Sequence, residues 1–344
     1  MKFGVLQFFS WPGRRFPLEQ VYDRGFDRMR RMDDSGYDAV WLAEHHFSTY
    51  SVCPSVHMMG THIAAHTKNI RIGTAVSLAS FYHPLRLAEE VALLDQLTKG
   101  RVNWGAGRGF DAKEHEIFGV APQDSYPKFR ESVEVVLKAW QDGPFSHKGD
   151  YFEFDDVEVL PKPYQEEIPV WMAVSSEDSI EWAASKGLSI MLGPHDSHDQ
   201  SRDKRALYRT ELENAGHAFE GRDLPLTRTI ALGETCEDGF ATGRRGAQFM
   251  FGSYLKNNKN IRGGSKAAAE GKTQSNDAVL AAQRENVDPV ERYVNDVALC
   301  GSPEKVIDDI ERLRECNGVD YLMIAPLSHE SFIRFTEKVV PHFL

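Results

Sequence analysis

Two short apolar runs limit what this chain can fold into. Residues 39–42 (AVWL) and 70–78 (IRIGTAVSL) are largely apolar and end abruptly in polar or small residues. Runs without polar alternation are typical of strands buried on both faces, as in a parallel sheet. The cluster Glu44-His45-His46 follows the first run directly. The sequence therefore predicts ionisable side chains at the carboxyl end of a buried parallel strand.

Strand-like and helix-like segments alternate along the rest of the chain. Strands are predicted at 2–7, 39–42, 70–78, 102–107, 170–173, 188–192, 226–232 and 319–324. Helices are predicted at 18–35, 55–66, 85–97, 126–141, 178–186, 197–215, 237–251, 303–316 and 331–340. Repeated βα units with about eight strands predict an α/β fold, a closed (β/α)8 TIM-like barrel. Residues 145–164 are expected to form a small β excursion, and 1–344 to form one domain.

A histidine at the end of a barrel strand indicates an enzyme. The carboxyl ends of the strands form the catalytic face of such barrels. The imidazole of His45 can change protonation near neutral pH. A histidine in this position is therefore a candidate acid or base.

Charge and cysteine content exclude several other classes. The formal net charge of −11 argues against nucleic acid and anionic membranes as partners. The four cysteines form no CxxC pair, so neither zinc nor a disulfide framework is indicated. His62 and His66 have helical spacing but no acidic partner, and no metal is expected. With no signal peptide or membrane span recognised, a cytoplasmic location is expected.

A polar, glycine-rich stretch interrupts the alternation at residues 254–289. Its composition cannot bury enough apolar surface to order itself. A loop of this length is typically disordered or a functional lid, and both readings stay open. A lid would shield a reactive intermediate of an enzyme from water, and this role favours a mobile lid.

Several motifs together resemble the bacterial luciferase family of flavin-dependent monooxygenases, in its luciferase α-like branch. They are MKFG, GYDAVWLAEHHF, IRIGTAVSL followed by YHP, RLAEEVALLDQLTKGRVNWGAGRG, SxxSxEWAA and GSPEKVIDDIERL. Their order and spacing cover nearly the whole chain, and the match is weakest after residue 254. The resemblance implies a TIM-like barrel that binds FMN, received as FMNH2 from a separate flavin reductase. It further implies reaction with O2 through a C4a-peroxyflavin, and a homodimer formed partly by the helix at 85–99.

The resemblance also assigns roles to residues around the flavin. His45 matches the proposed general base. The bond Ala75-Val76 matches a cis peptide bond, which is rare without proline. Gly107 stands in place of the reactive cysteine of luciferase, so efficient light emission is not expected. Leu192 is expected among the cofactor contacts.

The phosphate of FMN is assigned to a basic and hydroxyl-rich set. Arg108 matches the family's phosphate-side arginine. Ser176 and Ser179 begin a predicted helix, whose free N–H groups suit an anion. Ser176 equally suits a helix cap, and the two roles are compatible. Ser175 stands where luciferases carry a glutamate, and the backbone is expected to bind there.

The substrate and the reaction subtype stay open. Loop residues expected to face the substrate are mostly aromatic and uncharged, which favours a moderately apolar aldehyde, ketone or aromatic compound; they are Phe8, Phe9, Trp11, Phe47, Phe81, Phe110, Pro194 and His195. One alternative is a deazaflavin (F420)-dependent oxidoreductase of the same barrel type. Another is a non-catalytic, luciferase β-like flavin-binding subunit.

Overall fold

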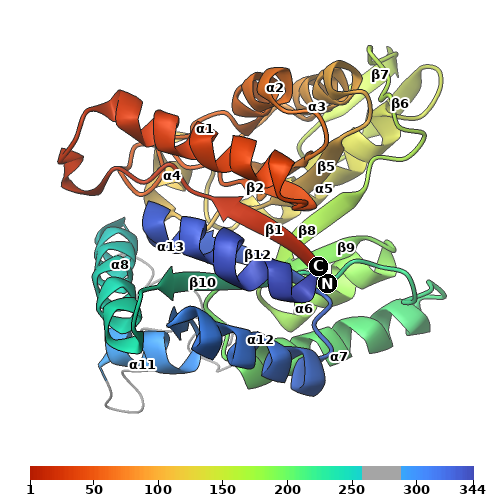
Figure 1. Cartoon of the computed structure of the whole chain (residues 1–344). Helices are drawn as coiled ribbons and strands as arrows, with labels where there is room; N and C mark the ends of the chain where they lie inside the picture. Colours follow the sequence, from red (N-terminus) through yellow and green to blue (C-terminus); the bar gives the residue numbers. More distant parts are fainter. Residues whose placement is uncertain (258–287) are drawn as a thin grey trace.

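The strands close into a barrel, as the alternating pattern predicts. The computed structural model describes residues 1–257 and 288–344. Eight parallel strands follow each other in the order β12, β1, β2, β3, β5, β8, β9 and β10, and β10 pairs with β12 to complete the ring (Figure 1). They are β1 (Lys2–Gln7), β2 (Ala39–Leu42), β3 (Arg71–Thr74), β5 (Val102–Gly107), β8 (Val170–Val174), β9 (Ser189–Leu192), β10 (Leu226–Leu232) and β12 (Tyr321–Pro326).

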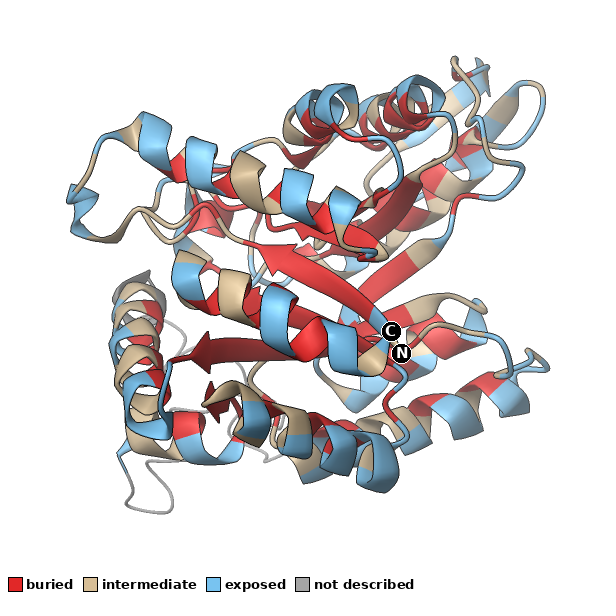
Figure 2. Cartoon of the chain, viewed as in Figure 1, coloured by how far each residue is buried: buried red, intermediate tan, exposed pale blue. Residues whose placement is uncertain are grey.

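Helices connect successive strands and cover the outside of the barrel (Figure 1). They are α1 (Leu18–Asp34), α2 (Val56–His66), α3 (Pro84–Thr98), α5 (Ser125–Ala139), α6 (Glu177–Ser185), α7 (His198–Asn214), α8 (Cys236–Asn257), α12 (Pro303–Asn317) and α13 (His329–Arg334). The chain continues from α13 through a π-helical turn at Phe335–Val339 into α14 (Val340–Phe343). The helices turn buried faces to the strands and exposed faces outward (Figure 2).

Short elements interrupt the repeat where side structures are inserted. The expected β excursion is an antiparallel pair, β6 (Phe145–Lys148) and β7 (Glu153–Val157). The predicted strand at 70–78 is wrong as a single strand: β3 ends at Thr74, and β4 (Ser77–Leu78) pairs separately with β5. Four elements were not predicted: a 3-10 turn at Pro12–Arg14, α4 (Ala112–Ile117), α11 (Pro289–Asp296) and β11 (Leu299–Gly301).

Two apolar layers hold the barrel together. The outer layer lies between strands and helices and contains most of the buried aliphatic side chains. The inner layer fills the barrel with Leu6, Trp41, Trp171, Met191 and Met323, among others. Trp41 and Trp171 meet edge to face at 5.4 Å between ring centroids. The interior is thus a packed core at this depth, as in other barrels of this type.

Polar side chains close the barrel at the amino ends of its strands. The Trp41 indole donates to the Tyr321 hydroxyl (3.0 Å), which donates to Asp38 (2.7 Å). Arg71 donates to Asn103 of the neighbouring strand (2.8 Å) and to Gln165 (3.0 Å). Because this end is sealed by satisfied hydrogen bonds, a ligand site is expected at the opposite, carboxyl end.

Two expectations concern segments rather than the barrel itself. The proposed lid at 254–289 lies almost entirely outside the described residues. Within residues 1–257 and 288–344, no helix combines the length and the apolar character needed to cross a bilayer.

Candidate functional site

Small, accessible residues surround the carboxyl ends of β3, β8 and β9. Ala173 is exposed although Met172 and Val174 beside it on β8 are buried. Ala75 is half-buried, and a Cβ built on Gly193 would meet no atom within 4 Å. Neighbouring strands therefore end in an open floor without long side chains, which leaves room for a flat ring.

Gly107 is fixed as a glycine by its neighbour Val76. The bond between Ala75 and Val76 is cis, which confirms that expectation. A Cβ on Gly107 would lie 2.3 Å from Val76 Cγ2 and 3.5 Å from Ala173 Cβ. A side chain of any kind at 107, a cysteine included, would overlap Val76. The absence of a thiol here thus follows from the packing of this chain.

Arg108 lies immediately after β5 and is linked to the start of α6. Its Nη1 donates to Ser125 Oγ (3.1 Å), and its guanidinium lies 5.8 Å from the Tyr126 ring centroid. Arg130 stacks on the same ring at 4.7 Å and donates to the Asp178 carboxylate (2.6 Å) in the first turn of α6. The structure thereby brings the predicted arginine to the same region as the predicted serines.

The serines form a complete helix cap. Ser176 Oγ accepts from Ser179 N (3.3 Å), and Ser179 Oγ accepts from Ser176 N (3.0 Å), which is a capping box. Ser179 Oγ also accepts from Ser175 N (3.2 Å). The cap is therefore self-sufficient, and the helix N-terminus adds a partial positive charge beside it.

His45 lies in an aromatic wall with a carboxylate behind it. The ring centroids of Phe8, Tyr50 and Phe110 lie 6.1, 4.9 and 5.5 Å from that of His45. Its Nδ1 lies 3.4 Å from Glu114 Oε1. Within the described parts of the chain, Nε2 has no hydrogen-bond partner. One ring nitrogen thus faces a negative charge, and the other is available for exchanging a proton.

His46 has a different environment, in agreement with a packing role. Its Nε2 lies 3.0 Å from Glu44 Oε1, and its ring meets Phe118 edge to face at 4.8 Å. The Glu44 carboxylate also accepts from Leu78 N (3.2 Å). Burial and the nearby Glu44 raise the pKa of Tyr82. This buried network ties β2 to β4.

Some predicted positions lie elsewhere. Leu192 is buried with its side chain in the outer layer, so that its backbone and Gly193 are the parts nearest the open floor. Phe9 was expected to face the substrate, which is wrong: its ring is buried in the outer layer against Tyr22. Trp11 donates its indole N–H to Phe16 O (2.8 Å) and packs against the same layer.

A cleft of about 1000 Å³ opens beside the aromatic wall. Phe8 and Tyr50, which contact His45, also line this cleft, and its other walls come from α1, α8 and α13. Such a volume accommodates a small organic molecule. In the part of the chain that the structure describes, no three potential metal ligands cluster together.

Some residues of the site were not predicted, because they lie far from His45 along the sequence. Glu114 is 2% exposed and accepts from His46 N (2.7 Å), although 68 positions separate them. Tyr50 and Arg28 also escaped notice, since neither lies in a recognisable motif. The Trp171 Nε1, buried two residues before Ala173, has no hydrogen-bond partner among the described residues. In the residue pattern itself, the position of a residue at the end of a strand was the feature that indicated a place in the site.

Comparisons with known proteins agree with this geometry. The model of a family described as luciferase-like monooxygenases matches residues 1–320. The alkanal monooxygenase alpha chain of Aliivibrio fischeri is 28% identical over 323 residues, covering 93% of this chain and 90% of its own. The oxygenase component of a flavin-dependent trigonelline monooxygenase from Acinetobacter baylyi is 26% identical over 251 residues, covering 72% and 69%.

A solved structure shares the whole fold. The oxygenating constituent of 3,6-diketocamphane monooxygenase from Pseudomonas putida, a type II Baeyer-Villiger monooxygenase in complex with FMN, has a TM-score of 0.79. It is 21% identical, and the match covers 100% of this chain and 99% of that one. Because the family model spans most of the chain, the protein belongs to the luciferase-like monooxygenase family.

Proposed function

We propose that the protein is the oxygenase of a two-component system that takes FMNH2 from a separate flavin reductase and uses O2. The observation that carries this proposal is the open floor of small residues at the carboxyl ends of β3 and β8, with His45 after the neighbouring strand β2. A relative that is an oxygenase component and a structural neighbour that binds FMN support it. The substrate would be a small molecule with an apolar reactive end, such as an aldehyde, a ketone or an aromatic compound.

The floor suits the isoalloxazine ring of FMN. Ala75 and Ala173 present no atoms beyond Cβ, and Gly107 between them makes room for Val76, so that a planar ring can approach the backbone closely. Val76, which is half-buried, adds one branched side chain against the ring. When bound, reduced FMN supplies the electrons that activate O2, while the protein provides positioning.

The phosphate would lie between Arg108 and the first turn of α6. Arg108 supplies a charge, and the helix start supplies N–H groups and the hydroxyls of Ser176 and Ser179. Ser175, exposed beside them, would contribute its backbone. Leu192 would contribute its backbone at the far side of the ring.

His45 would hold or move the proton that oxygenation requires. Glu114 beside Nδ1 would orient the ring and leave Nε2 for the proton exchange. A base with this arrangement typically contributes about 10²- to 10⁴-fold to the rate. Phe8, Tyr50 and Phe110 would exclude water around the reacting atoms.

A homodimer through α2 and α3 is also proposed. Met58 of α2 is 76% exposed, and Leu93 and Leu97 of α3 are 48% and 56% exposed. Leu93 and Leu97 are four residues apart and therefore share one helix face. Large apolar side chains gathered on neighbouring helices typically mark an interface. Light scattering on the purified protein would give the mass in solution.

An F420-dependent oxidoreductase is the alternative to exclude. A secondary alcohol dehydrogenase in complex with an F420-acetone adduct shares the fold, with a TM-score of 0.76 at 18% identity, so fold alone does not discriminate. Anaerobic titration with FMNH2 and with reduced F420, followed by mixing with O2, separates the two. Tight FMNH2 binding with oxygen consumption supports the proposal. Tight F420 binding without FMNH2 binding would refute it, and FMNH2 binding without oxygen transfer to any substrate would indicate a non-catalytic subunit.

A further inference from the structure

The cleft beside His45 is lined by residues other than those of the proposed flavin floor, since neither Ala75 nor Ala173 lines it. Its walls come from the carboxyl ends of β1, β10 and β12 and from α1, α8 and α13, whose ends face one another (Figure 1). Phe8 and Tyr50 form the end nearest His45. The rest of the cleft is lined largely by charged residues, whereas the end near His45 is aromatic.

The charges that line the cleft are mainly positive. Five arginines line it (Arg15, Arg24, Arg28, Arg245 and Arg334), against three carboxylates (Glu234, Asp238 and Glu330). Glu234 already neutralises Arg334 at 2.9 Å. None of the other four arginines has a carboxylate within 4.0 Å among residues 1–257 and 288–344. In a protein with a net charge of −11, this local excess of cations is unusual.

Arg28 on α1 is the innermost of these cations. It is half-buried and borders the cleft, and desolvation lowers its pKa to about 10 despite the nearby Glu330. Its guanidinium lies 5.8 Å from the Phe332 ring centroid, and its Nη1 makes one long hydrogen bond, 3.4 Å, to Gln7 Oε1. Its Nε is buried without a partner among the described residues. A guanidinium has five N–H donors, so most of the donor capacity of Arg28 is unused.

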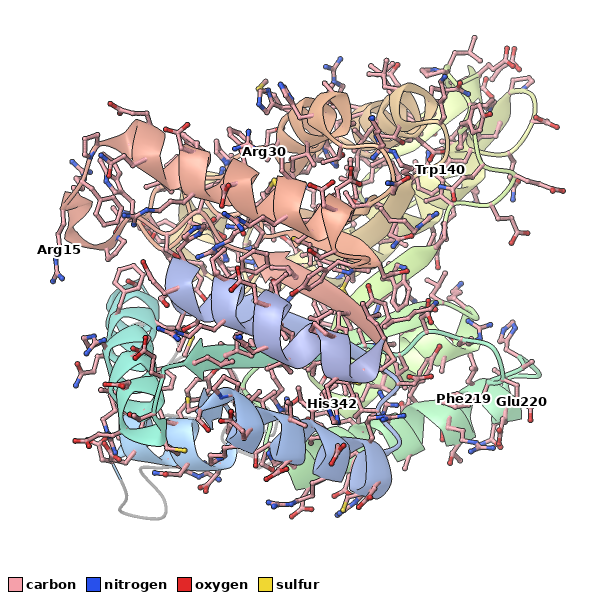
Figure 3. The ribbon with its side chains drawn as sticks, viewed as in Figure 1. Arg15, Arg30, Trp140, Phe219, Glu220 and His342 are labelled. Carbon is pink, nitrogen blue, oxygen red and sulfur yellow. The ribbon has the colours of Figure 1, made fainter. Side chains whose placement is uncertain are left out.

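The other charged groups near Arg28 do not satisfy it. His329 on α13 lies 3.5 Å from Asp27, which is thereby engaged. Asp27 also accepts from Arg31 at 2.8 Å. Arg24, one turn before Arg28 on α1, stacks on Phe16 at 5.0 Å and adds a second positive charge. Arg15 projects away from the body of the protein (Figure 3), and Arg24 is exposed, so Arg28 is the more enclosed cation of the two on α1.

Arg28 is connected to the reaction site through two residues. Gln7 accepts from Arg28 and donates to Phe8 O (2.5 Å), while the Phe8 ring stacks on His45. A half-buried guanidinium whose Nε is buried without a partner gains stability when a ligand completes its hydrogen bonds. We propose that Arg28 binds an anionic oxygen group, a carboxylate or a sulfonate, at the end of the substrate opposite the one that His45 serves. This inference names the substrate class and rests on the proposed function.

Matched probes test this proposal by isothermal titration calorimetry. The probes are octanoate, 1-octanesulfonate and 1-octanol, which share a chain and differ in the end group. Both anions should bind roughly 10- to 100-fold more tightly than the alcohol, the range for a hydrogen bond to a charged group. Between the anions, tighter binding of octanoate would identify a carboxylate and tighter binding of octanesulfonate a sulfonate.

Two variants on the same helix locate the effect. Arg28→Gln should abolish the preference for the anions and leave octanol binding unchanged. Arg30→Gln should change neither, because Arg30 is exposed on α1 and does not line the cleft (Figure 3). Equal affinity for all three probes in the parent protein overturns the proposal, even where Arg28→Gln folds poorly. Absence of binding by any probe, or an anion preference that survives in Arg28→Gln, also overturns it.

FMNH2 binding and oxygen consumption are measured on the same samples. They distinguish failure of the proposed substrate class from failure of the proposed function. Absence of an anion preference in the parent protein, with flavin binding intact, refutes only the substrate class. Anion binding that depends on Arg28, in a protein that binds no flavin, refutes the proposed function and leaves Arg28 as an anion site.

Discussion

Gly107→Ala should destabilise the protein, because Val76 already occupies the space that a side chain at 107 needs. The new Cβ would lie 2.3 Å from Val76 Cγ2, whereas ordinary contact begins at 3.4 Å, so the overlap is 3.4 − 2.3 = 1.1 Å. Val76 is β-branched and has little freedom to rotate away. Overpacking of this kind costs about 1–3 kcal/mol.

Removing the obstructing methyl groups should restore most of this loss. Val76→Ala takes away Cγ2 and leaves Cβ, which lies at a tolerable 3.2 Å from the new methyl group. Because Val76 is only half-buried, its truncation alone should cost less than about 1 kcal/mol. Urea unfolding of the parent, both single variants and the double variant should give a coupling free energy of about 1–2 kcal/mol.

Gly105→Ala provides the matched control. Its Cβ would lie 2.0 Å from the backbone oxygen of Thr74, an obstacle that Val76→Ala does not remove. The effects of these two substitutions should therefore add within about 0.5 kcal/mol. The explanation is refuted if Gly107→Ala unfolds like the parent, or if Val76→Ala rescues Gly105→Ala equally well.

Three further predictions concern catalysis, cofactor binding and pH. His45→Ala should leave FMNH2 binding intact and lower product yield roughly 10²- to 10⁴-fold. His46→Ala should mainly lower the stability of the protein. Unchanged turnover of His45→Ala would show that the His45 imidazole takes no part in the mechanism. Arg108→Ala should weaken FMN binding by about 1.5–3 kcal/mol in a fluorescence titration, and an unaltered Kd would move the phosphate site elsewhere. Burial, with the Arg228 charge, lowers the pKa of His195 to about 4, so the unfolded chain binds a proton that the folded protein excludes. The free energy of unfolding should therefore fall by about 2 kcal/mol from this group between pH 7 and pH 5, and His195→Asn should remove that part of the slope.

The barrel could be predicted because its strands are locally encoded. The run at 39–42 is apolar and buried at every position, so its pattern identifies it without tertiary information. The division between β3 and β4 could not be predicted, because it depends on the backbone at Ala75 and Val76. That geometry was expected only from the family resemblance.

The residues of the site that directly follow a barrel strand could be predicted from the sequence. Those that lie on other elements could not. His45 and Arg108 follow strands directly, so the barrel rule places them at the carboxyl end. Glu114 and Arg28 lie on helices, and only the folded chain brings them to His45 and to the cleft. Phe9 failed for the opposite reason: adjacent strand-end residues point in alternate directions, and the ring of Phe8, not Phe9, faces inward.

The self-completing cap at Ser176 and Ser179 bears on how long a bound anion would stay. With the serines already bonded to each other, an incoming phosphate exchanges existing hydrogen bonds for new ones and gains little more than the contribution of Arg108. The forms with and without bound phosphate then differ little in free energy at the start of α6. Such a near balance favours rapid loading and release over permanent retention, as the proposed transfer of flavin from a separate reductase requires.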